Sequence, residues 1–212
     1  MGNMVAVLVN IRSVHNVGSI FRTADAAGVS KIYLCGITPT PLDRFGRFRG
    51  DFTKVSLGAE RYVAWEQIAS AARLLGRLKR DGYLVCAVEQ SPQSVTYDKF
   101  KIQNSKLKIA LIFGNEVNGL PQSLLARADH VLEIPMRGAV VRRARHPRHT
   151  GWGKESLNVA VAFGIVAFHL LRHPSPTLRN GYPLLLRSYG IAQDSFGKVL
   201  ARNTGAKGIP KL

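Results

Sequence analysis

Three short segments of the chain combine strand-like apolar runs with polar side chains that could bind or orient a ligand. The first, Asn10–Asp25, places Asn16 and Arg22 beyond an apolar run. Amide and guanidinium groups of this kind hold hydroxyl and phosphate oxygens through hydrogen bonds. A helix N-cap at Asn16 and a solvated arginine at Arg22 explain the same two residues without any ligand. Composition alone leaves both interpretations open.

The second segment, Ile109–Pro121, runs from an apolar stretch into the sequence FGNEVNGLP. Glycine at Gly114 lets a backbone approach a ligand closely, and a following helix N-terminus offers free N–H groups. The segment matches neither a dinucleotide-binding GxGxxG pattern nor a P-loop, because no GK[ST] follows. Glu116 could therefore orient a ligand or cap the helix.

The third segment places Ile134 and Met136 after a strand-like run and resumes at Glu155–Val159, which contains Ser156 and Asn158. Ser156 is a suitable helix cap. Asn158 stands at the start of an otherwise apolar helix, where we expect a buried amide that needs hydrogen-bond partners.

The elements that must position these side chains alternate along the chain. We expect strands at Val5–Val9, Lys31–Cys35, Tyr83–Val88, Ile109–Phe113 and His130–Ile134. We expect helices at Val14–Ala27, at Trp65–Arg80, from Pro121 and at Ser156–Arg172. This alternation predicts an α/β fold with a parallel sheet and helices on both faces. Ligands of such sheets bind at the carboxyl ends of the strands, where all three segments fall.

Composition narrows the class of protein. The 212 residues include 30 Lys plus Arg and 13 Asp plus Glu, a formal charge of +17, and residues 137–212 hold 13 of the bases and 2 of the acids. Such a field favours a polyanion, with RNA or DNA ahead of an anionic membrane surface. The two cysteines form no metal motif or disulfide framework. The start lacks a signal peptide, and the longest apolar run is too short to span a bilayer, so we expect a soluble, cytoplasmic protein.

Taken together, the three segments resemble a known family. N-x(5)-R, FGNE-x-x-G-L and IPM followed by SLNVAVA are similar to the three motifs of the SpoU (TrmH-type) RNA 2′-O-methyltransferases of the SPOUT superfamily. Lys54–Glu60 also resembles that family's segment between the first two motifs. The resemblance covers Val5 to Arg172, apart from a basic insertion.

The resemblance implies a C-terminal trefoil knot, a homodimer and a pocket for S-adenosylmethionine, with no metal. It assigns five residues to donor binding: Gly114, Ile134, Met136, Leu157 and, at the end of a strand and fixed by no motif, Val88. It also implies that Arg22 works across the dimer interface on the substrate phosphate and the 2′-hydroxyl. The residues that position this arginine and the ribose are then Asn16, Glu116, Ser156 and Asn158.

Two regions depart from the family pattern or lie outside it. We expect a methyltransferase domain at 1–172 with a basic insertion at about 139–153, and a basic, proline-containing tail at 173–212. The insertion could grip RNA, be a tolerated solvated loop, or impair activity. A second basic stretch, Arg44–Phe52, interleaves arginine and phenylalanine, and its alternative is a loop with Phe side chains packed inward. The candidate RNA-binding residues are Arg44, Arg47, Arg49, Arg142, Arg143, Arg145 and Arg148.

The sequence therefore predicts an enzyme that transfers methyl from S-adenosylmethionine to a ribose 2′-hydroxyl of tRNA or rRNA. Because the motif pattern begins almost at Met1, we expect no separate N-terminal RNA-binding domain. The alternative is a catalytically impaired RNA-binding protein that retains the fold. A membrane-surface protein is a distant third, since no basic amphipathic helix is paired with an exposed apolar face.

Overall fold

A single parallel sheet organises the chain. The computed structural model describes residues 4–102, 106–136 and 156–171, all of which belong to one compact unit, Met1–His173. The strands are β1 (Met4–Val9), β2 (Lys31–Cys35), β3 (Ala64–Ile68), β4 (Tyr83–Val88), β5 (Val95–Thr96), β6 (Lys108–Phe113) and β7 (His130–Glu133). Their order is β3-β2-β1-β6-β4-β7-β5, and every neighbouring pair is parallel.

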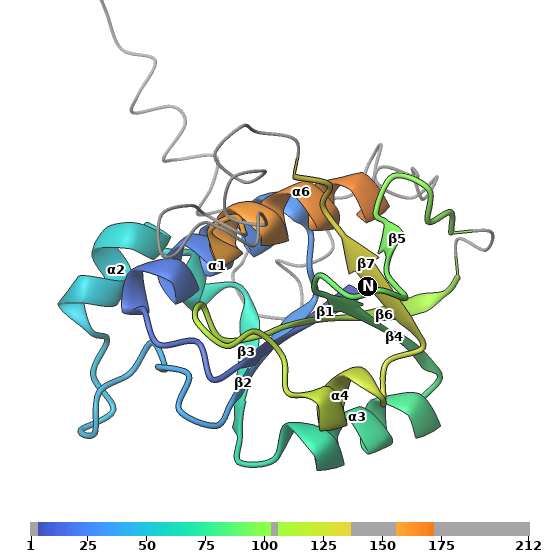
Figure 1. The fold of residues 1–212 in the computed structure, drawn as a ribbon. Helices are drawn as coiled ribbons and strands as arrows, with labels where there is room; N and C mark the ends of the chain where they lie inside the picture. Colours follow the sequence, from blue (N-terminus) through green and yellow to red (C-terminus); the bar gives the residue numbers. More distant parts are fainter. Residues whose placement is uncertain (1–3, 103–105, 137–155, 172–212) are drawn as a thin grey trace, which may run out of the picture. The chain divides into compact units, whose positions relative to one another are not determined.

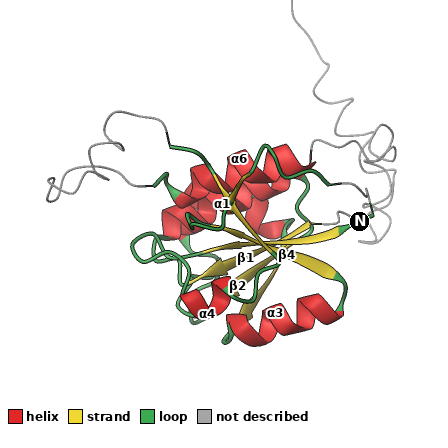
Figure 2. Cartoon of the chain, turned by 45° about the vertical axis from the view of Figure 1, so that its right-hand side comes forward, coloured by secondary structure: helices red, strands yellow, loops and turns green. Residues whose placement is uncertain are grey.

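Helices cover both faces of the sheet, as predicted (Figures 1 and 2). One face carries α1 (Val14–Ala27), α2 (Gly50–Ser56), the short 3-10 helix η1 (Ala59–Arg61) and α6 (Val159–Leu171). The other face carries α3 (Ala71–Arg80) and α4 (Gln122–Leu125). The strand β1 shows why the sheet is buried on both sides: Met4, Ala6 and Leu8 join the first core, whereas Val5, Val7 and Val9 join the second. Such continuous apolar strands are typical of covered parallel sheets.

The two cysteines are buried and free, as expected. Burial raises the pKa of the Cys35 thiol and of the Cys86 thiol to about 12 each, because the thiolate would lose its hydration. Within the described residues, no helix is both long and apolar enough to cross a membrane.

The helix predicted at Trp65–Arg80 was wrong over its first part. Ala64–Ile68 is strand β3, which pairs with β2 at the edge of the sheet. Helix α3 begins only at Ala71, where Ser70 in an extended conformation accepts a hydrogen bond from the N–H of Arg73. The apolar residues of an edge strand and of the next helix happened to share a helical spacing, which hid the boundary.

Two further elements were not predicted from the sequence. Gly50–Ser56 forms helix α2, and Val95–Thr96 forms the two-residue edge strand β5. Phe52 of α2 is fully buried and meets Phe21 of α1 edge to face, with ring centroids 5.2 Å apart. Helix α2 therefore packs against α1.

Candidate active site

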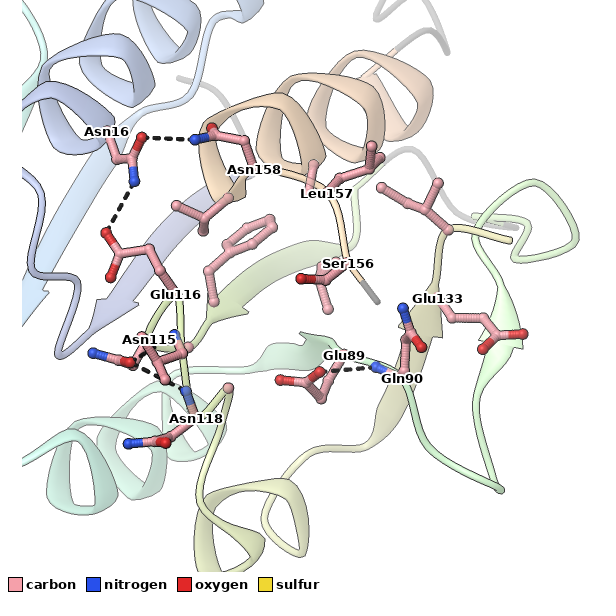
Figure 3. Close-up of a pocket in the computed structure, with 18 of the residues that line it drawn as sticks. Asn16, Glu89, Gln90, Asn115, Glu116, Asn118, Glu133, Ser156, Leu157 and Asn158 are labelled. Atoms are coloured by element: carbon pink, nitrogen blue, oxygen red, sulfur yellow. Dashed lines mark hydrogen bonds between the residues drawn. The ribbon is translucent and has the colours of Figure 1, made fainter. Parts of the chain in front are cut away.

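The three motif segments meet around one cavity at the carboxyl ends of the central strands. The cavity has a volume of about 680 Å³. Eight of the predicted site residues line it: Asn16, Val88, Gly114, Glu116, Ile134, Ser156, Leu157 and Asn158. They come from β4, β6, β7 and the starts of α1 and α6, and Figure 3 shows their arrangement. The topology brings them together because parallel strands end at one edge.

A hydrogen-bond network joins the three segments. Asn16 Nδ2 donates to Glu116 Oε1 over 2.9 Å, and Asn158 Nδ2 donates to Asn16 Oδ1 over 2.9 Å. These contacts, drawn in Figure 3, span 100 and 142 residues of sequence. We call this the Glu116–Asn16–Asn158 network. It fixes the orientation of both amides, since each uses donor and acceptor sides in a defined way.

Glu116 binds the backbone just before α1, whose N-cap is Ser13, rather than capping the helix that follows it in sequence. Its two carboxylate oxygens accept the backbone N–H groups of Arg12 and Ser13, over 3.0 and 3.1 Å. Burial alone would raise its pKa, but the hydrogen bonds from Arg12, Asn16 and Ser13 together hold the pKa of Glu116 below its usual value. The carboxylate is therefore ionised at neutral pH. Its negative charge interacts favourably with the positive, N-terminal end of the α1 dipole.

Asn158, and not Ser156, caps α6. Its Oδ1 accepts the N–H groups of Ala160 and Val161, over 2.9 and 3.4 Å, so the helix begins at Val159 instead of Ser156. The expectation that this amide is buried was wrong, because Asn158 is exposed at the rim of the cavity. Its predicted need for partners was confirmed by the two cap bonds and by Asn16.

The turn after β6 brings the backbone close to itself at Gly114. A Cβ atom there would lie 2.3 Å from the carbonyl carbon of Gly119, so only glycine fits. Asn115 closes the turn, because its Nδ2 donates to the carbonyl of Asn10 over 2.7 Å and its Oδ1 accepts the N–H of Val117 over 2.8 Å. Pro121 lies one residue before α4, at its N-cap.

Sequence reasoning missed Glu89, which lines the cavity directly after β4. Its Oε2 accepts the N–H of Leu120 over 2.9 Å and its Oε1 accepts its neighbour Gln90's N–H over 3.0 Å. The signal was available, since a carboxylate that follows a buried parallel strand falls at the ligand edge of the sheet. Asn115 was likewise present in the FGNE segment but was given no role.

Comparison with known proteins shows the family of the chain. The family model described as SpoU rRNA Methylase family matches residues 3–141. The chain belongs to this family. A tRNA (guanosine(18)-2′-O)-methyltransferase from Borreliella burgdorferi is 27% identical over 78% of the chain, and a 23S rRNA (guanosine-2′-O-)-methyltransferase from Pseudomonas aeruginosa is 27% identical over 82%. The chain spans 64% and 60% of their lengths.

A solved structure confirms the fold of this SpoU family member. The AdoMet-bound rRNA methyltransferase from Sinorhizobium meliloti superposes with a TM-score of 0.65 at 29% identity, over 80% of this chain and 56% of that one. The parallel sheet with its helices is therefore a SpoU-type fold, as the motif resemblance implied.

Two residues assigned by the resemblance lie away from the cavity wall of this SpoU chain. Arg22 is exposed on α1, and it lines neither the main cavity nor the shallower groove between α1 and α6. Met136 is partly buried and is not among the described lining residues. No group of three His, Cys, Asp or Glu side chains within the described ranges could hold a metal ion.

The basic loop before α2 presents an aromatic ring with two cations. The guanidinium carbons of Arg44 and Arg47 lie 4.7 and 5.7 Å from the centre of the Phe45 ring, which is 65% exposed. Arg49 instead pairs with Asp51 over 2.9 Å. The inward packing considered as the alternative holds for Phe52 and not for Phe45. The predicted RNA-binding residues Arg142, Arg143, Arg145 and Arg148 lie outside the described residues.

Proposed function

We propose that this protein transfers a methyl group from S-adenosylmethionine to a ribose 2′-hydroxyl of tRNA or rRNA. The observation that carries the proposal is the Glu116–Asn16–Asn158 network, which ties all three SpoU motifs to one cavity. The printed activities of the relatives, 2′-O-methylation of tRNA and of 23S rRNA, point the same way.

The residues around the cavity fit the methyl donor. Val88, Ile134 and Leu157 offer apolar surface for the adenine side, and Met136 follows two residues after Ile134. The glycine turn at Gly114 brings backbone groups to the cavity wall. A cavity of about 680 Å³ lies within the range of small-molecule sites. When bound, S-adenosylmethionine supplies an electrophilic methyl on a sulfonium, so the transfer needs no metal.

The chain's own residues would place the ribose and accommodate its proton. Positioning of the 2′-oxygen in line with the methyl supplies much of the rate, and the hydroxyl proton must leave. Arg22 is a poor base at an ordinary arginine pKa, so we assign it to anchoring the substrate phosphate and orienting the hydroxyl. Asn16, Glu116, Ser156 and Asn158 would hold this arrangement from the cavity rim.

A homodimer explains why Arg22 stands outside its own cavity. Helix α6 exposes Val161 at 51% and Phe168 at 47%, beside the groove that it forms with α1. We propose that a second copy covers this face and brings its Arg22 to the neighbouring cavity. We also propose the trefoil knot between β7 and α6, by analogy with the SPOUT superfamily.

The dimer is testable through α6 itself. Phe168→Glu should give a monomer in sedimentation velocity, because it places a charge on the covered apolar face. Tyr62→Glu changes a residue that is 81% exposed at the end of η1, outside the groove between α1 and α6, and should leave the dimer intact. A wild-type protein that sediments as a monomer at micromolar concentration contradicts the proposal.

The remaining basic regions would hold the RNA. We propose that 1–172 is the methyltransferase domain with a basic insertion at about 139–153, and that 173–212 is a basic tail. Arg44 and Arg47 would contact phosphates while Phe45 stacks on an unpaired base. Arg49, paired with Asp51, would add less. Arg142, Arg143, Arg145 and Arg148 would add to the grip from the insertion.

The decisive experiment incubates the protein with methyl-labelled S-adenosylmethionine and total RNA, and then maps any labelled ribose. Incorporation at a discrete 2′-oxygen supports the proposal. Donor binding and RNA binding without incorporation would favour the catalytically impaired RNA-binding protein. Absence of donor binding would contradict both the enzyme and its cofactor.

A further inference from the structure

The described residues that line the cavity carry a charge opposite to that of the whole chain. The described residues that line it include three carboxylates, Glu89, Glu116 and Glu133, and no lysine, arginine or histidine. The complete chain has a formal charge of +17. Carboxylates concentrate ligands of positive charge, so these three described side chains favour a cation over a phosphate group.

Glu89 is the carboxylate held over the interior of the cavity. Glu116 is engaged by three donors at the side of α1, and Glu133 points away from the other labelled residues in Figure 3. Glu89 lies between the Asn115–Asn118 turn and Gln90 (Figure 3). Its two hydrogen bonds within the described residues come from N–H donors, and each carboxylate oxygen keeps a lone pair for a ligand.

The fold makes room for this carboxylate at a specific place. A Cβ atom on Gly119 would lie 2.3 Å from Glu89 Oε2, and Gly119 also has a φ of 63°, which favours glycine. The same glycine therefore permits the turn and admits the Glu89 side chain. The bonds to Leu120 and Gln90 then hold the carboxylate against the cavity, so the negative charge is prearranged before a ligand arrives.

We propose that Glu89 recognises the positive charge of the methyl donor and makes the cavity select charged adenosyl ligands over uncharged ones. This inference rests on the proposed function, which supplies S-adenosylmethionine as the ligand with its sulfonium and ammonium groups. A carboxylate could instead accept hydrogen bonds from the ribose hydroxyls, and that role does not distinguish charged from uncharged ligands. The two roles therefore give different binding patterns.

The test compares S-adenosylmethionine with 5′-methylthioadenosine, which has the same adenosine part and no positive charge. Isothermal titration calorimetry on the full chain gives Kd for both ligands in the wild type and in Glu89→Gln. We expect the preference for S-adenosylmethionine to fall about five-fold, which is the contribution of a partly exposed charge pair. Glu66→Gln, which removes the same charge from β3 outside the cavity, should leave the preference unchanged.

A second variant separates recognition from loop support. Glu89→Gln keeps only one acceptor oxygen and weakens the link to Leu120, whereas Glu89→Asp keeps the charge on a shorter side chain. Glu89→Asp should bind both ligands more weakly and retain most of the preference. If Glu89→Gln weakens both ligands by the same factor, the charge-recognition role is overturned. If the wild type binds neither ligand, the proposed function fails instead.

Discussion

At the scale of single residues, Arg22 is the most informative side chain, although it does not line the described cavity. Arg22 is exposed on α1 and makes no hydrogen bond or ion pair with the described part of its own chain. An arginine without partners among the described residues keeps side-chain entropy that a substrate or partner must overcome. The proposed dimer would account for its presence in the first SpoU motif, because the side chain would then serve the partner's active site.

Arg22→Ala should nearly abolish methyl transfer while leaving S-adenosylmethionine binding and the free energy of unfolding almost unchanged. Labelled-methyl incorporation and calorimetry measure the two activities. Arg73→Ala, at an exposed arginine on the opposite face of the sheet, is the matched control. Full turnover in the Arg22 variant would remove this residue from the mechanism.

Glu116 should make stability depend on pH in a defined direction. Its folded-state pKa is lowered from the ordinary value of 4.5, so its contribution to stability is present above that value and is lost as the pH falls through the lower, folded value. Glu116→Gln should cost about 1–2 kcal/mol of unfolding free energy at pH 7, because charged hydrogen bonds to α1 are lost.

Urea denaturation of both proteins at pH 7 and at about pH 3.5 measures this dependence. The difference between wild type and variant should shrink at the lower pH. A difference that is the same at both values would show that the carboxylate charge contributes nothing.

At the scale of elements, the turn between β6 and α4 packs backbone against backbone at Gly114. Gly114→Ala should destabilise the protein by about 1–3 kcal/mol and weaken donor binding, because the new methyl meets backbone atoms that cannot move aside individually. Gly50→Ala is the control, since a Cβ there meets nothing within 4 Å and lies in helix α2. Thermal unfolding measures the stability of the two variants, and calorimetry measures their donor binding. If the two variants behave alike, the close approach at Gly114 is unimportant.

The side-chain amide of Asn158 both caps helix α6 and belongs to the candidate site. Asn158→Ala should lose the cap, worth about 1 kcal/mol, together with the bond to Asn16. Asn158→Asp keeps an acceptor for the cap but has no donor for Asn16, so it should retain most of the stability and still lose activity. Denaturation and methyl transfer measured on the same samples separate these effects. Equal activity in Asn158→Asp and wild type would assign Asn158 to capping alone.

At the scale of the whole molecule, the described basic loop and the described cavity lining carry opposite charges. Arg44 and Arg47 stack on the exposed Phe45, whereas the described cavity lining has only acidic charges. Under the proposed function, this separation would hold the phosphates of RNA at the basic loop and leave the cavity to the cationic methyl donor. The separation follows from the fold, because the basic loop precedes α2 and the carboxylates follow the strands.

Replacing Arg44 and Arg47 together by glutamine should weaken RNA binding and flatten its dependence on salt. Each lost phosphate contact lowers the slope of log K against log salt by about 0.7–0.9. Fluorescence anisotropy over a salt series measures the slope. The control exchanges Arg73 and Arg80 on α3, which are also exposed. Equal slopes for the two double variants would place the RNA elsewhere.

The sequence by itself determined the fold class and most of the candidate site. Apolar runs such as Met4–Val9 can only be buried on both faces, and that requirement leads to a parallel sheet with helices on either side. The motif order assigned Asn16, Glu116 and Asn158 to one site, and the described structure brings them into hydrogen-bond contact. These features are local in sequence or are carried by specific spacing.

Only the tertiary structure decided the features that depend on what lies nearby in space. The boundary between β3 and α3 was hidden because pairing with β2, and not intrinsic propensity, makes Ala64–Ile68 a strand. Glu116 became a partner of Asn16, 100 residues away in sequence, and Glu89 became part of the cavity, because distant strands end side by side. Hydrogen bonds and charges act over a few ångströms, and the sequence does not contain those distances.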